Sequence, residues 1–398
     1  MSTANWSRAT CKHLYEVNGT IQQCYFSDDD LLHAIYSFIE PKPHEWVFTA
    51  LYGIVFVLGL TGNFLVCFAV WKNSQLRTST NLFLVNLAAA DFLVITLCLP
   101  PSYIQAIWET WFLGDTMCRI VEYYQTVTII VSVLTLTAIS IERWFAICHP
   151  LTFKETKRRV VISIVVIWML AHTLAVPRLL LFKETPDEMI PQNLTLLLTS
   201  CTPDKSMNTL ALNYDIFIFV TFYLVPVVIM AYTYVSIAAC LWSSTKTGSH
   251  LTEGEQSAVT AQVQARRRAA RMLIVVVLVF IMCFLPMYTW NLMRLTDSPL
   301  IAMIHPHSVS ICTLTAHWLV YFNSSINPII YNFMSGKFRK EFRSVCSCIH
   351  IPCDGKDMRR YNNHELEPLS TTKGGRRYIG KESESYDVSR SRTVFSEA

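Results

Sequence analysis

The chain has 398 residues, of which 52% are hydrophobic and only 16% are charged, and its formal net charge is +4. Soluble globular domains carry about 25% charged residues, so this composition, with a positive mean hydropathy, excludes an ordinary soluble fold. The 13 cysteines are scattered without paired CxxC spacings, which excludes a disulfide miniprotein and a zinc domain. The small net charge gives no reason to expect a nucleic-acid partner.

Apolar runs long enough to cross a membrane recur along the chain. A helix that spans about 30 Å of hydrocarbon needs about 20 mainly apolar residues, because its backbone polar groups must be satisfied within the helix. Seven segments meet this requirement: 46–71, 81–107, 118–149, 160–182, 214–242, 269–295 and 307–333. The sequence therefore predicts an all-α membrane protein, a seven-transmembrane helix bundle.

Lysine and arginine gather on one side of these spans, and the rule that cytoplasmic loops are basic assigns that side to the cytoplasm. The residues are Lys72, Arg77, Lys154, Lys157, Arg158, Arg159, Arg266, Arg267, Arg268, Arg271, Lys337, Arg339, Lys340 and Arg343. Sequons for N-glycosylation at Asn5, Asn18 and Asn193 all fall on the opposite side. We therefore expect a multi-pass plasma-membrane protein with an extracellular N-terminal tail, residues 1–45.

Two further segments follow the last span. In residues 334–348, Phe338 and Phe342 alternate with basic residues, which predicts a short amphipathic helix on an anionic membrane surface. The cysteines behind it are either palmitoylated or unmodified thiols, and they are Cys346, Cys348 and Cys353. Residues 349–398 predict a disordered cytoplasmic tail with serines that receptor kinases phosphorylate and arrestin then binds.

Polar side chains inside the spans are candidate functional residues, because a charged group there costs roughly 2.5–3.5 kcal/mol on insertion scales. Those of the second, third and seventh spans are Asp91, Ser132, Asn323, Ser324 and Asn327. If these helices adjoin, the side chains form a buried cluster that holds either a sodium ion or only a hydrogen-bonded packing network. Both alternatives stay open at this stage.

At the membrane border of the third span, Glu142 stands beside Arg143. An ion pair there has a modest net energy because both groups lie near water, and this suits a breakable latch. The alternative is an arginine that extends its charge to the headgroups and has no switching role. Separately, kinks are predicted where prolines interrupt the spans, at Pro177, Pro226, Pro286 and Pro328.

Further motifs follow in order: GN at 62–63, LAAAD ending at Asp91, Trp111, Cys118, ERW at 142–144, Trp168, Pro226, Tyr234, CFLP at 283–286 and NPIIY at 327–331. The set resembles the rhodopsin-like G-protein-coupled receptors, from Asp28 to Cys348. This implies a receptor that activates heterotrimeric G proteins, with a disulfide between Cys118 and Cys201. The residues that it assigns to activation are Glu142, Arg143, Tyr234, Phe284, Asn327, Pro328 and Tyr331. Phe284 replaces the more common tryptophan and keeps an aromatic switch.

Four segments narrow the resemblance to the orexin receptors and the invertebrate allatotropin receptors: DDDLLHAIYSFIEPKPHEW, SVLTLTAISIERWFAICHPLTFK, QARRRAARMLIVVVLVF and HWLVYFNSSINPIIYNFMSGKFRKEF. This implies a neuropeptide ligand, coupling to Gq and calcium mobilisation. The ligand-binding residues that it implies are Gln125, Thr126, Asn291, His317, Tyr321 and Tyr214. Ile218 stands where orexin receptors carry an aromatic residue, which leaves open other peptide subgroups, such as neuropeptide FF or cholecystokinin-like receptors.

Gln125 lies two helical turns beyond Cys118, at the place where amine receptors carry an aspartate. Glutamine makes only neutral hydrogen bonds, which favours backbone amides or a terminal amide as the group recognised. A core glutamine satisfied by neighbouring helices is the alternative. For His317, contact with the ligand competes with roles as a metal ligand or a pH sensor.

The N-terminal tail contains a predicted helix. Leu31, Leu32, Ile35, Phe38 and Ile39 recur at helical spacing behind the aspartates at 28–30, which we expect to cap its N-terminus. In the orexin-like group such a helix sits over the pocket and helps to bind the peptide. Cys11 and Cys24 either form a second disulfide or remain free.

Two other classes share the membrane topology or composition. A transporter fold usually shows paired half-repeats with broken helices, and no such repetition is apparent. An intramembrane enzyme needs catalytic Ser-His pairs, paired aspartates or an HExxH motif within the spans, and the sequence lacks them. The sequence therefore favours a receptor that is not an enzyme and needs no cofactor.

Overall fold

The computed structural model describes residues 13–17, 20–25, 27–150, 152, 156–186, 195, 197–246, 253–296, 298–334 and 338–343. They all belong to one compact unit, Met1–Val345, and the second unit, Cys346–Ala398, lies outside the described residues. Several sequence predictions lie outside them as well. These are the sequons at Asn5, Asn18 and Asn193, the pairing of Cys11 with Cys24, the cysteines Cys346, Cys348 and Cys353, and the tail.

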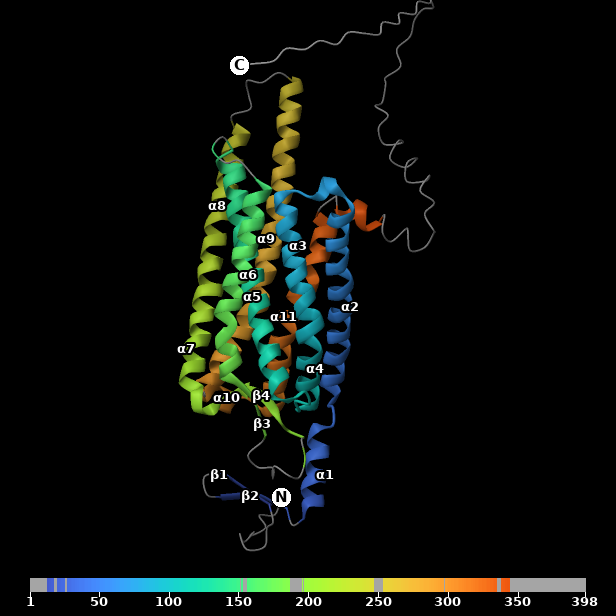
Figure 1. The fold of residues 1–398 in the computed structure, drawn as a ribbon, viewed down its shortest axis with the longest axis vertical. Coiled ribbons are helices and arrows are strands. Elements are labelled where there is room, and N and C mark those ends of the chain that lie inside the picture. Colours follow the sequence, from blue (N-terminus) through green and yellow to red (C-terminus); the bar gives the residue numbers. More distant parts are fainter. Residues whose placement is uncertain are drawn as a thin grey trace, which may run out of the picture. The chain divides into compact units, whose positions relative to one another are not determined.

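Each predicted span coincides with a helix or with a run of helices (Figure 1). In chain order they are α2 (Pro43–Lys72), α3 (Ser79–Leu93) with η2 (Val94–Cys98) and α4 (Leu99–Trp108), α5 (Gly114–Cys148), α6 (Lys157–Leu181), α7 (Asn208–Phe219) with η4 (Val220–Leu224) and α8 (Val225–Lys246), α9 (Glu253–Leu295), and α11 (Pro306–Met334). α5 packs against α3, α6 and α8, while α11 packs against α2 and α9. The predicted seven-helix bundle is confirmed.

Among the described residues, six spans are apolar enough by composition to cross a membrane, and α11 is the exception. Its hydropathy is lowered by polar side chains that are buried in the protein, namely Asn323, Ser324, Ser325 and Asn327. By contrast, α2 and α6 expose large apolar side chains such as Val57 and Val165. Because neighbouring helices cover the polar face of α11, this helix crosses the membrane without exposing that face to lipid.

The bundle has two chemically different ends. At the disulfide end, Cys118 of α5 is bonded to Cys201 of β4, with their Cα atoms 5.5 Å apart, as the family resemblance implied. Here β3 (Phe182–Thr185) pairs antiparallel with β4 (Ser200–Pro203). The basic end carries Lys72, Arg77, Arg143 and Lys157 and corresponds to the side that the sequence assigns to the cytoplasm.

An ion pair holds the β3–β4 hairpin to the following loop. The Lys183 ammonium lies 2.8 Å from the Asp204 carboxylate. The hydrogen bond from Lys183, reinforced by those from Ser206, lowers the pKa of Asp204 to about 2. Lys183 is exposed to solvent and Asp204 is partly exposed, so the pair orders the loop without adding much to stability.

Two spans contain a π-helical turn, in which an extra residue widens the helix. η4 lies directly before Pro226, where the sequence predicts a kink, and η2 lies before Pro100 and Pro101, where it predicts none. Proline cannot donate a backbone hydrogen bond, so a local change of helix type satisfies the freed carbonyl groups. The sequence also predicts kinks at Pro177, Pro286 and Pro328, which lie inside α6, α9 and α11 respectively.

α1 (Asp28–Ile39) is the helix predicted in the N-terminal tail, but its cap differs from the prediction. Ser27 caps it: its hydroxyl accepts the Asp30 N–H at 3.1 Å, and the Asp30 carboxylate accepts the Ser27 N–H at 3.1 Å. This capping box leaves the aspartates in the first turn, where their negative charges interact favourably with the positive end of the helix dipole. Phe38 is exposed. The buried face consists of Leu31, Ile35 and Ile39, and it packs against Leu197 and Leu198.

Several short elements were not predicted, and the β3–β4 hairpin is one example. A hairpin of β1 (His13–Val17) and β2 (Thr20–Tyr25) precedes α1. The others are η1 (Ser74–Leu76), η3 (Lys205–Met207) and α10 (Pro299–Met303). Each is too short to show a periodic apolar pattern, so sequence reasoning had no signal for it.

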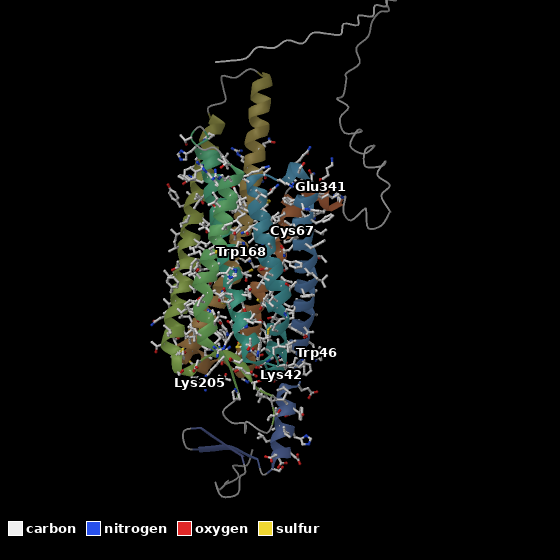
Figure 2. The ribbon with its side chains drawn as sticks, in the orientation of Figure 1. Lys42, Trp46, Cys67, Trp168, Lys205 and Glu341 are labelled. Carbon is white, nitrogen blue, oxygen red and sulfur yellow. A yellow bond between two sulfur atoms is a disulfide. The ribbon has the colours of Figure 1, made fainter. Side chains whose placement is uncertain are left out.

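The amphipathic segment predicted after the last span is described over residues 338–343, which are helical. Its apolar side chains Phe338 and Phe342 are buried, and the Phe338 ring lies 6.1 Å from that of Tyr331. Asn73 donates to the Glu341 carboxylate at 2.7 Å, and Figure 2 shows Glu341 at the basic end of the bundle. The two aromatic side chains thus pack against the bundle, while the position of this segment on the membrane surface stays a prediction.

Candidate functional site

The predicted ligand residues of α5 lie in the disulfide half of the bundle. Gln125 is half-buried, and its side-chain oxygen is inaccessible to solvent and accepts no hydrogen bond from a described residue. Thr126 is buried and donates to the Glu122 carbonyl at 3.0 Å. The unused acceptor of Gln125 argues against a core glutamine satisfied by its neighbours, because a buried acceptor without a partner costs about 1–3 kcal/mol.

An ion pair between two helices adjoins these residues. The Arg178 guanidinium, in the last turn of α6, donates to the Asp215 carboxylate of α7 at 2.5 Å and to the Thr126 hydroxyl at 3.2 Å. It also lies 5.1 Å from the ring centroids of both Phe182 and Tyr214. Arg178 thus links α5, α6 and α7 through one side chain, with aromatic rings against its cationic faces.

A second carboxylate belongs to this group. Glu122, one turn before Thr126 on α5, interacts electrostatically with both Arg178 and Asp215. It makes no salt bridge within the part of the chain that the structure describes. The three ionisable side chains therefore carry one positive and two negative formal charges when all are ionised.

Sequence reasoning missed Glu122, Arg178 and Asp215 as site residues. All three fall inside predicted spans, so the rule that intramembrane charges mark functional sites points to them. What no sequence signal provides is the contact between Arg178 and Asp215, because they are on different helices.

The other predicted ligand residues are less closely connected. Tyr214 is buried and donates to the Leu174 carbonyl at 2.9 Å, while the Tyr321 hydroxyl donates to the Cys98 carbonyl at 3.4 Å. Asn291 contacts Met287 of its own helix at 3.2 Å. His317 and Asn291 make no hydrogen bond to Gln125 among the described residues. The structure thus brings Thr126 and Tyr214 together around Arg178, but it does not join the predicted residues into one hydrogen-bonded set.

The predicted polar cluster of the second and seventh spans forms in part. Asp91 is buried, and its carboxylate accepts the Asn327 amide at 2.8 Å, with the Ser324 hydroxyl beside it. One oxygen each of Asp91, Asn327 and Asn63 is buried without a described hydrogen-bond donor. Ser132 and Asn323 are buried too, but neither makes a described hydrogen bond to Asp91.

The chemistry of these three oxygen atoms suits a small hard cation, which prefers carboxylate and amide oxygens as ligands. A separate packing network lies nearby: Asn86 donates to the Thr135 hydroxyl at 2.8 Å and accepts the Trp168 indole N–H at 2.8 Å. Figure 2 shows Trp168 about halfway along the bundle. The buried oxygens of Asp91, Asn327 and Asn63 therefore fit a sodium site, while Asn86, Thr135 and Trp168 form a packing network without an ion.

At the basic end, the Arg143 guanidinium lies 3.3 Å from the carboxylate of its neighbour Glu142. Tyr234 of α8 is buried and accepts the Ser140 hydroxyl of α5 at 3.0 Å. The hydrogen bond from Ser140 to Tyr234 thus joins α5 to α8 at this end.

The remaining predicted activation residues lie between these two ends. Phe284 is buried, and its ring lies 4.8 Å from that of Phe280 and 6.3 Å from that of Tyr288. Tyr331 is buried, and its hydroxyl has no hydrogen-bond partner among the described residues. Pro328 packs so closely on Gly62 that a Cβ atom at Gly62 would lie 2.9 Å from the proline Cβ, which explains why this position of α2 takes glycine.

Comparison with known proteins places this geometry in a family. Residues 62–331 match the model of the 7 transmembrane receptor (rhodopsin family). Neuropeptide FF receptor 2 of Mus musculus is 31% identical over 94% of this chain and 91% of its own length. The QRFP-like peptide receptor of Branchiostoma floridae is 33% identical over 75% of this chain and 76% of its own length.

The chain therefore belongs to the rhodopsin family of seven-transmembrane receptors. It is a multi-pass membrane protein of the plasma membrane that signals through a heterotrimeric G protein, and it is not an enzyme. The resemblance to rhodopsin-like receptors is confirmed, and the transporter and enzyme alternatives are excluded. Both relatives are peptide receptors by name, in agreement with the neuropeptide class expected from the sequence.

Proposed function

We propose that the chain is a receptor for an extracellular neuropeptide that is orexin-like or allatotropin-like and C-terminally amidated. The observation that carries this proposal is the neutral side chain of Gln125, whose buried oxygen is not used by the described residues. A peptide or terminal amide N–H supplies the matching donor, whereas the ammonium group of an amine ligand pairs better with a carboxylate. His317 and Asn291 are proposed as further contacts from α11 and α9.

The charges near Gln125 add a requirement for the ligand. Asp215 is paired with Arg178, which leaves the Glu122 carboxylate as the surplus negative charge of the group. We propose that the peptide places a basic side chain near Glu122. A cation there offsets the desolvated carboxylate, and a neutral or acidic residue does not.

A neuropeptide FF-like ligand is the second candidate. It is favoured by the 31% identity with neuropeptide FF receptor 2 over nearly the whole chain, and by Ile218, which departs from the orexin pattern. Gln125 is compatible with both candidates, because its side chain would bind an amide group of the peptide and not a particular side chain.

We propose that the N-terminus is extracellular and the basic end cytoplasmic, following the distribution of lysine and arginine. Activation is then a shift toward the conformation in which the cytoplasmic end of α9 moves outward and a G protein of the Gq class binds beside Arg143. Phe284, Tyr234 and Tyr331 are proposed to rearrange in this shift. Receptor kinases and arrestin are proposed partners of the tail.

The ligand proposal is tested by calcium recording in cells that express the full chain. Orexin-like, allatotropin-like and neuropeptide FF-like amidated peptides are compared with the same peptides as free acids. Gln125→Ala and His317→Ala should lower potency about tenfold, the effect of one lost hydrogen bond to the ligand, at unchanged surface expression. Thr173→Ala is the matched control, because Thr173 is exposed and its hydroxyl donates to the Met169 carbonyl of its own helix.

Two outcomes would count against the proposal. Equal potency of amidated and free-acid peptides would contradict recognition of a terminal amide by Gln125. Unchanged potency of both alanine variants would show that Gln125 and His317 do not contact the ligand. Silence toward all three peptide families reopens the ligand without affecting membership of the receptor family.

A sodium ion beside Asp91 is proposed as an allosteric ligand of the inactive state. Agonist affinity should then fall as sodium chloride replaces choline chloride at constant ionic strength, and Asp91→Asn should abolish that difference. Asn86→Ala, in the neighbouring packing network, should retain it. A sodium effect that persists in Asp91→Asn contradicts the site.

A further inference from the structure

Two cysteines face each other where α5 and α8 meet, close to the basic end of the bundle. The thiol of Cys148, the last residue of α5, donates to the Ser236 carbonyl of α8 at 3.7 Å. In return, the Cys240 thiol of α8 donates to the Ile147 carbonyl of α5 at 3.9 Å. The two thiols also lie within hydrogen-bond reach of each other. Neither belongs to a disulfide in the structure, so the pair is a dithiol.

Apolar packing holds the two helices together at this level. Ile147 of α5 belongs to the same buried cluster as Ile237 and Leu241 of α8. Cys240 lies between these two α8 residues, and Cys148 packs against the cluster. Both cysteines are only half-buried. The fold therefore sets the separation of the two thiols without enclosing them.

A pair of thiols can bind a soft metal ion or form a disulfide. A structural zinc site needs four ligands. Among the described residues, no group of three or more histidine, cysteine, aspartate or glutamate side chains is placed to hold a metal ion. The pair therefore suits thiol–disulfide chemistry. In the cytosol, to which the proposed orientation assigns this end, disulfides are usually transient and redox-sensing.

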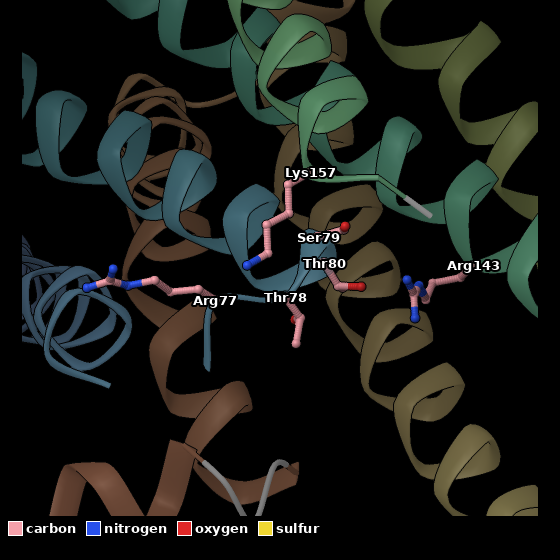
Figure 3. A pocket seen from close by; sticks show the side chains of 6 residues that line it. All are labelled: Arg77, Thr78, Ser79, Thr80, Arg143 and Lys157. Carbon is pink, nitrogen blue, oxygen red and sulfur yellow. The ribbon is translucent and has the colours of Figure 1, made fainter. Parts of the chain in front are cut away.

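The surroundings of the pair are cationic. The Arg267 guanidinium of α9 donates at 3.3 Å to the carbonyl of Leu241, the residue after Cys240. At the same end, Figure 3 shows Lys157 and Arg77 in the lining of a cavity of about 490 Å³, and none of its six lining residues is acidic. Positive charge raises the local concentration of an anionic reagent. Glutathione, with two carboxylates and one ammonium group, is such a reagent, and it sets the redox poise of the cytosol.

We propose that Cys148 and Cys240 form a reversible disulfide by exchange with glutathione disulfide, and that this bond locks α5 to α8. The thiolate of one cysteine attacks glutathione disulfide, which forms a mixed disulfide and releases one glutathione. The second cysteine attacks the receptor sulfur of the mixed disulfide and releases the other glutathione. The receptor loses two electrons and two protons, and glutathione disulfide becomes two molecules of reduced glutathione.

The bond would act on a helix pair that takes part in the proposed activation. Ser140 of α5 donates to Tyr234 of α8 about two turns from the thiols, and Tyr234 is one of the residues proposed to rearrange. A covalent link between the same helices restrains that rearrangement and holds the receptor in its resting state. This consequence rests on the proposed function, whereas formation of the disulfide does not depend on the peptide or on the G protein.

The first test is peptide mapping by mass spectrometry. The full-length receptor in phosphatidylcholine nanodiscs is equilibrated with reduced and oxidised glutathione in increasing oxidised proportion, its remaining thiols are alkylated, and it is digested without reduction. The variants are Cys148→Ser and Cys240→Ser. The matched control is Cys67→Ser, which removes another half-buried thiol, on α2.

A peptide linked through Cys148 and Cys240 should appear as the oxidised proportion rises and should disappear when reduced glutathione is restored. The Cys118–Cys201 disulfide should persist throughout, because structural disulfides resist the glutathione pool. Each single serine variant should carry glutathione on its remaining cysteine instead of the link. Cys67→Ser should form the link to the same extent as the wild type.

The second test is agonist-free nucleotide exchange by a Gq-class protein on the same samples. Exchange should fall in proportion to the linked fraction and should recover on reduction. The double variant Cys148→Ser with Cys240→Ser carries neither the link nor a glutathione at these positions, so its exchange should not respond to the glutathione buffer. Melting temperatures of the reduced variants equal to that of the wild type establish that they are folded.

Three results would overturn the proposal. Absence of the linked peptide in every buffer shows that the two cysteines cannot form a disulfide in the folded receptor. Undiminished exchange at a high linked fraction shows that the bond does not lock the helices. An equal fall in the wild type and in the double variant assigns the effect to other cysteines. Absence of exchange in every sample, including the reduced wild type, contradicts the proposed Gq coupling, and the peptide map still decides whether the disulfide forms.

Discussion

The two ends of the bundle hold their arginines in different ways. At the disulfide end, Arg178 joins three helices, with a carboxylate on α7, a hydroxyl on α5 and two aromatic rings against it. At the basic end, the Arg143 guanidinium lies 3.3 Å from the carboxylate of Glu142, its own neighbour in α5, and a neutral hydrogen bond from Ser140 to Tyr234 joins α5 to α8. Charge-assisted hydrogen bonds are roughly twice as strong as neutral ones. We therefore expect the disulfide end to stay fixed more firmly than the basic end.

This comparison predicts its largest effect at Arg178. Arg178→Met leaves the partly buried carboxylate of Asp215, whose side chain is 18% exposed, without its cation. A fully buried pair broken on one side costs about 3–5 kcal/mol, so the loss here should lie at or below the lower end of that range. The melting temperature of the purified receptor and its surface expression should both fall. The double variant Arg178→Met with Asp215→Leu should recover part of the loss, because of the two carboxylates near Arg178 only that of Glu122 then lacks a cation. If Arg178→Met alone were as stable as the wild type, the Arg178–Asp215 pair would not contribute to the stability of the bundle.

The next effect is expected at Glu122, on ligand binding and not on stability. Glu122→Gln removes the surplus negative charge and should lower the potency of a peptide with a basic residue about tenfold, or about 1.4 kcal/mol. The control is the same peptide with its basic residue replaced by a neutral one, which should act equally on both receptors. A loss of the same size for the neutral peptide would mean that Glu122 maintains the structure of the pocket and does not pair with a charge on the peptide.

At the basic end, Glu142→Gln should raise signalling in the absence of ligand. The pair is partly exposed and is worth about 0.2–1 kcal/mol, so the increase should not exceed about fivefold. The measurement is agonist-free nucleotide exchange by a Gq-class protein in membranes. Glu109→Gln, at the disulfide end, is the control. Lower basal exchange in Glu142→Gln would contradict a latch that holds the receptor inactive.

The smallest effect is expected outside the bundle, at α1. Ile35→Ser removes a buried contact with Leu197 and Leu198 and should lower peptide potency only a few-fold, because the bundle itself is unaffected. Tyr36→Ser is the matched control, since the adjacent side chain is 58% exposed. Equal losses for a small pocket ligand and for the peptide would exclude a role of α1 in holding the peptide.

The fold and the candidate site were predictable to different degrees. Apolar runs of about 20 residues located every span, because the hydrocarbon thickness sets a length that no loop satisfies. The capping of α1 was assigned to aspartates, although the cap is Ser27, because both residue types suit that position and only the backbone geometry separates them. The packing of Phe338 against the bundle could not be predicted for a related reason: an amphipathic pattern does not say whether lipid or protein covers the apolar face.

The proposed ligand residues show the same limit. Gln125 was identified from the family resemblance, and its neutral side chain then argued for a neutral partner. Glu122 and Asp215 are charged residues inside predicted spans and were overlooked, so they were predictable in principle. Their link through Arg178 was not, since it joins positions 37 residues apart along the chain.

The sequence by itself determined the class of fold, the number of spans and the side on which the basic residues lie, because membrane insertion depends on composition and on local charge. Only the tertiary structure decided which polar groups meet. Arg178 of α6 pairs with Asp215 of α7, and Lys157 of α6 lies beside the first turn of α3 (Figure 3). The side-chain oxygen of Gln125 accepts no hydrogen bond from a described residue. These are contacts between helices, and the sequence pattern within one helix carries no information about the rotation of its neighbour.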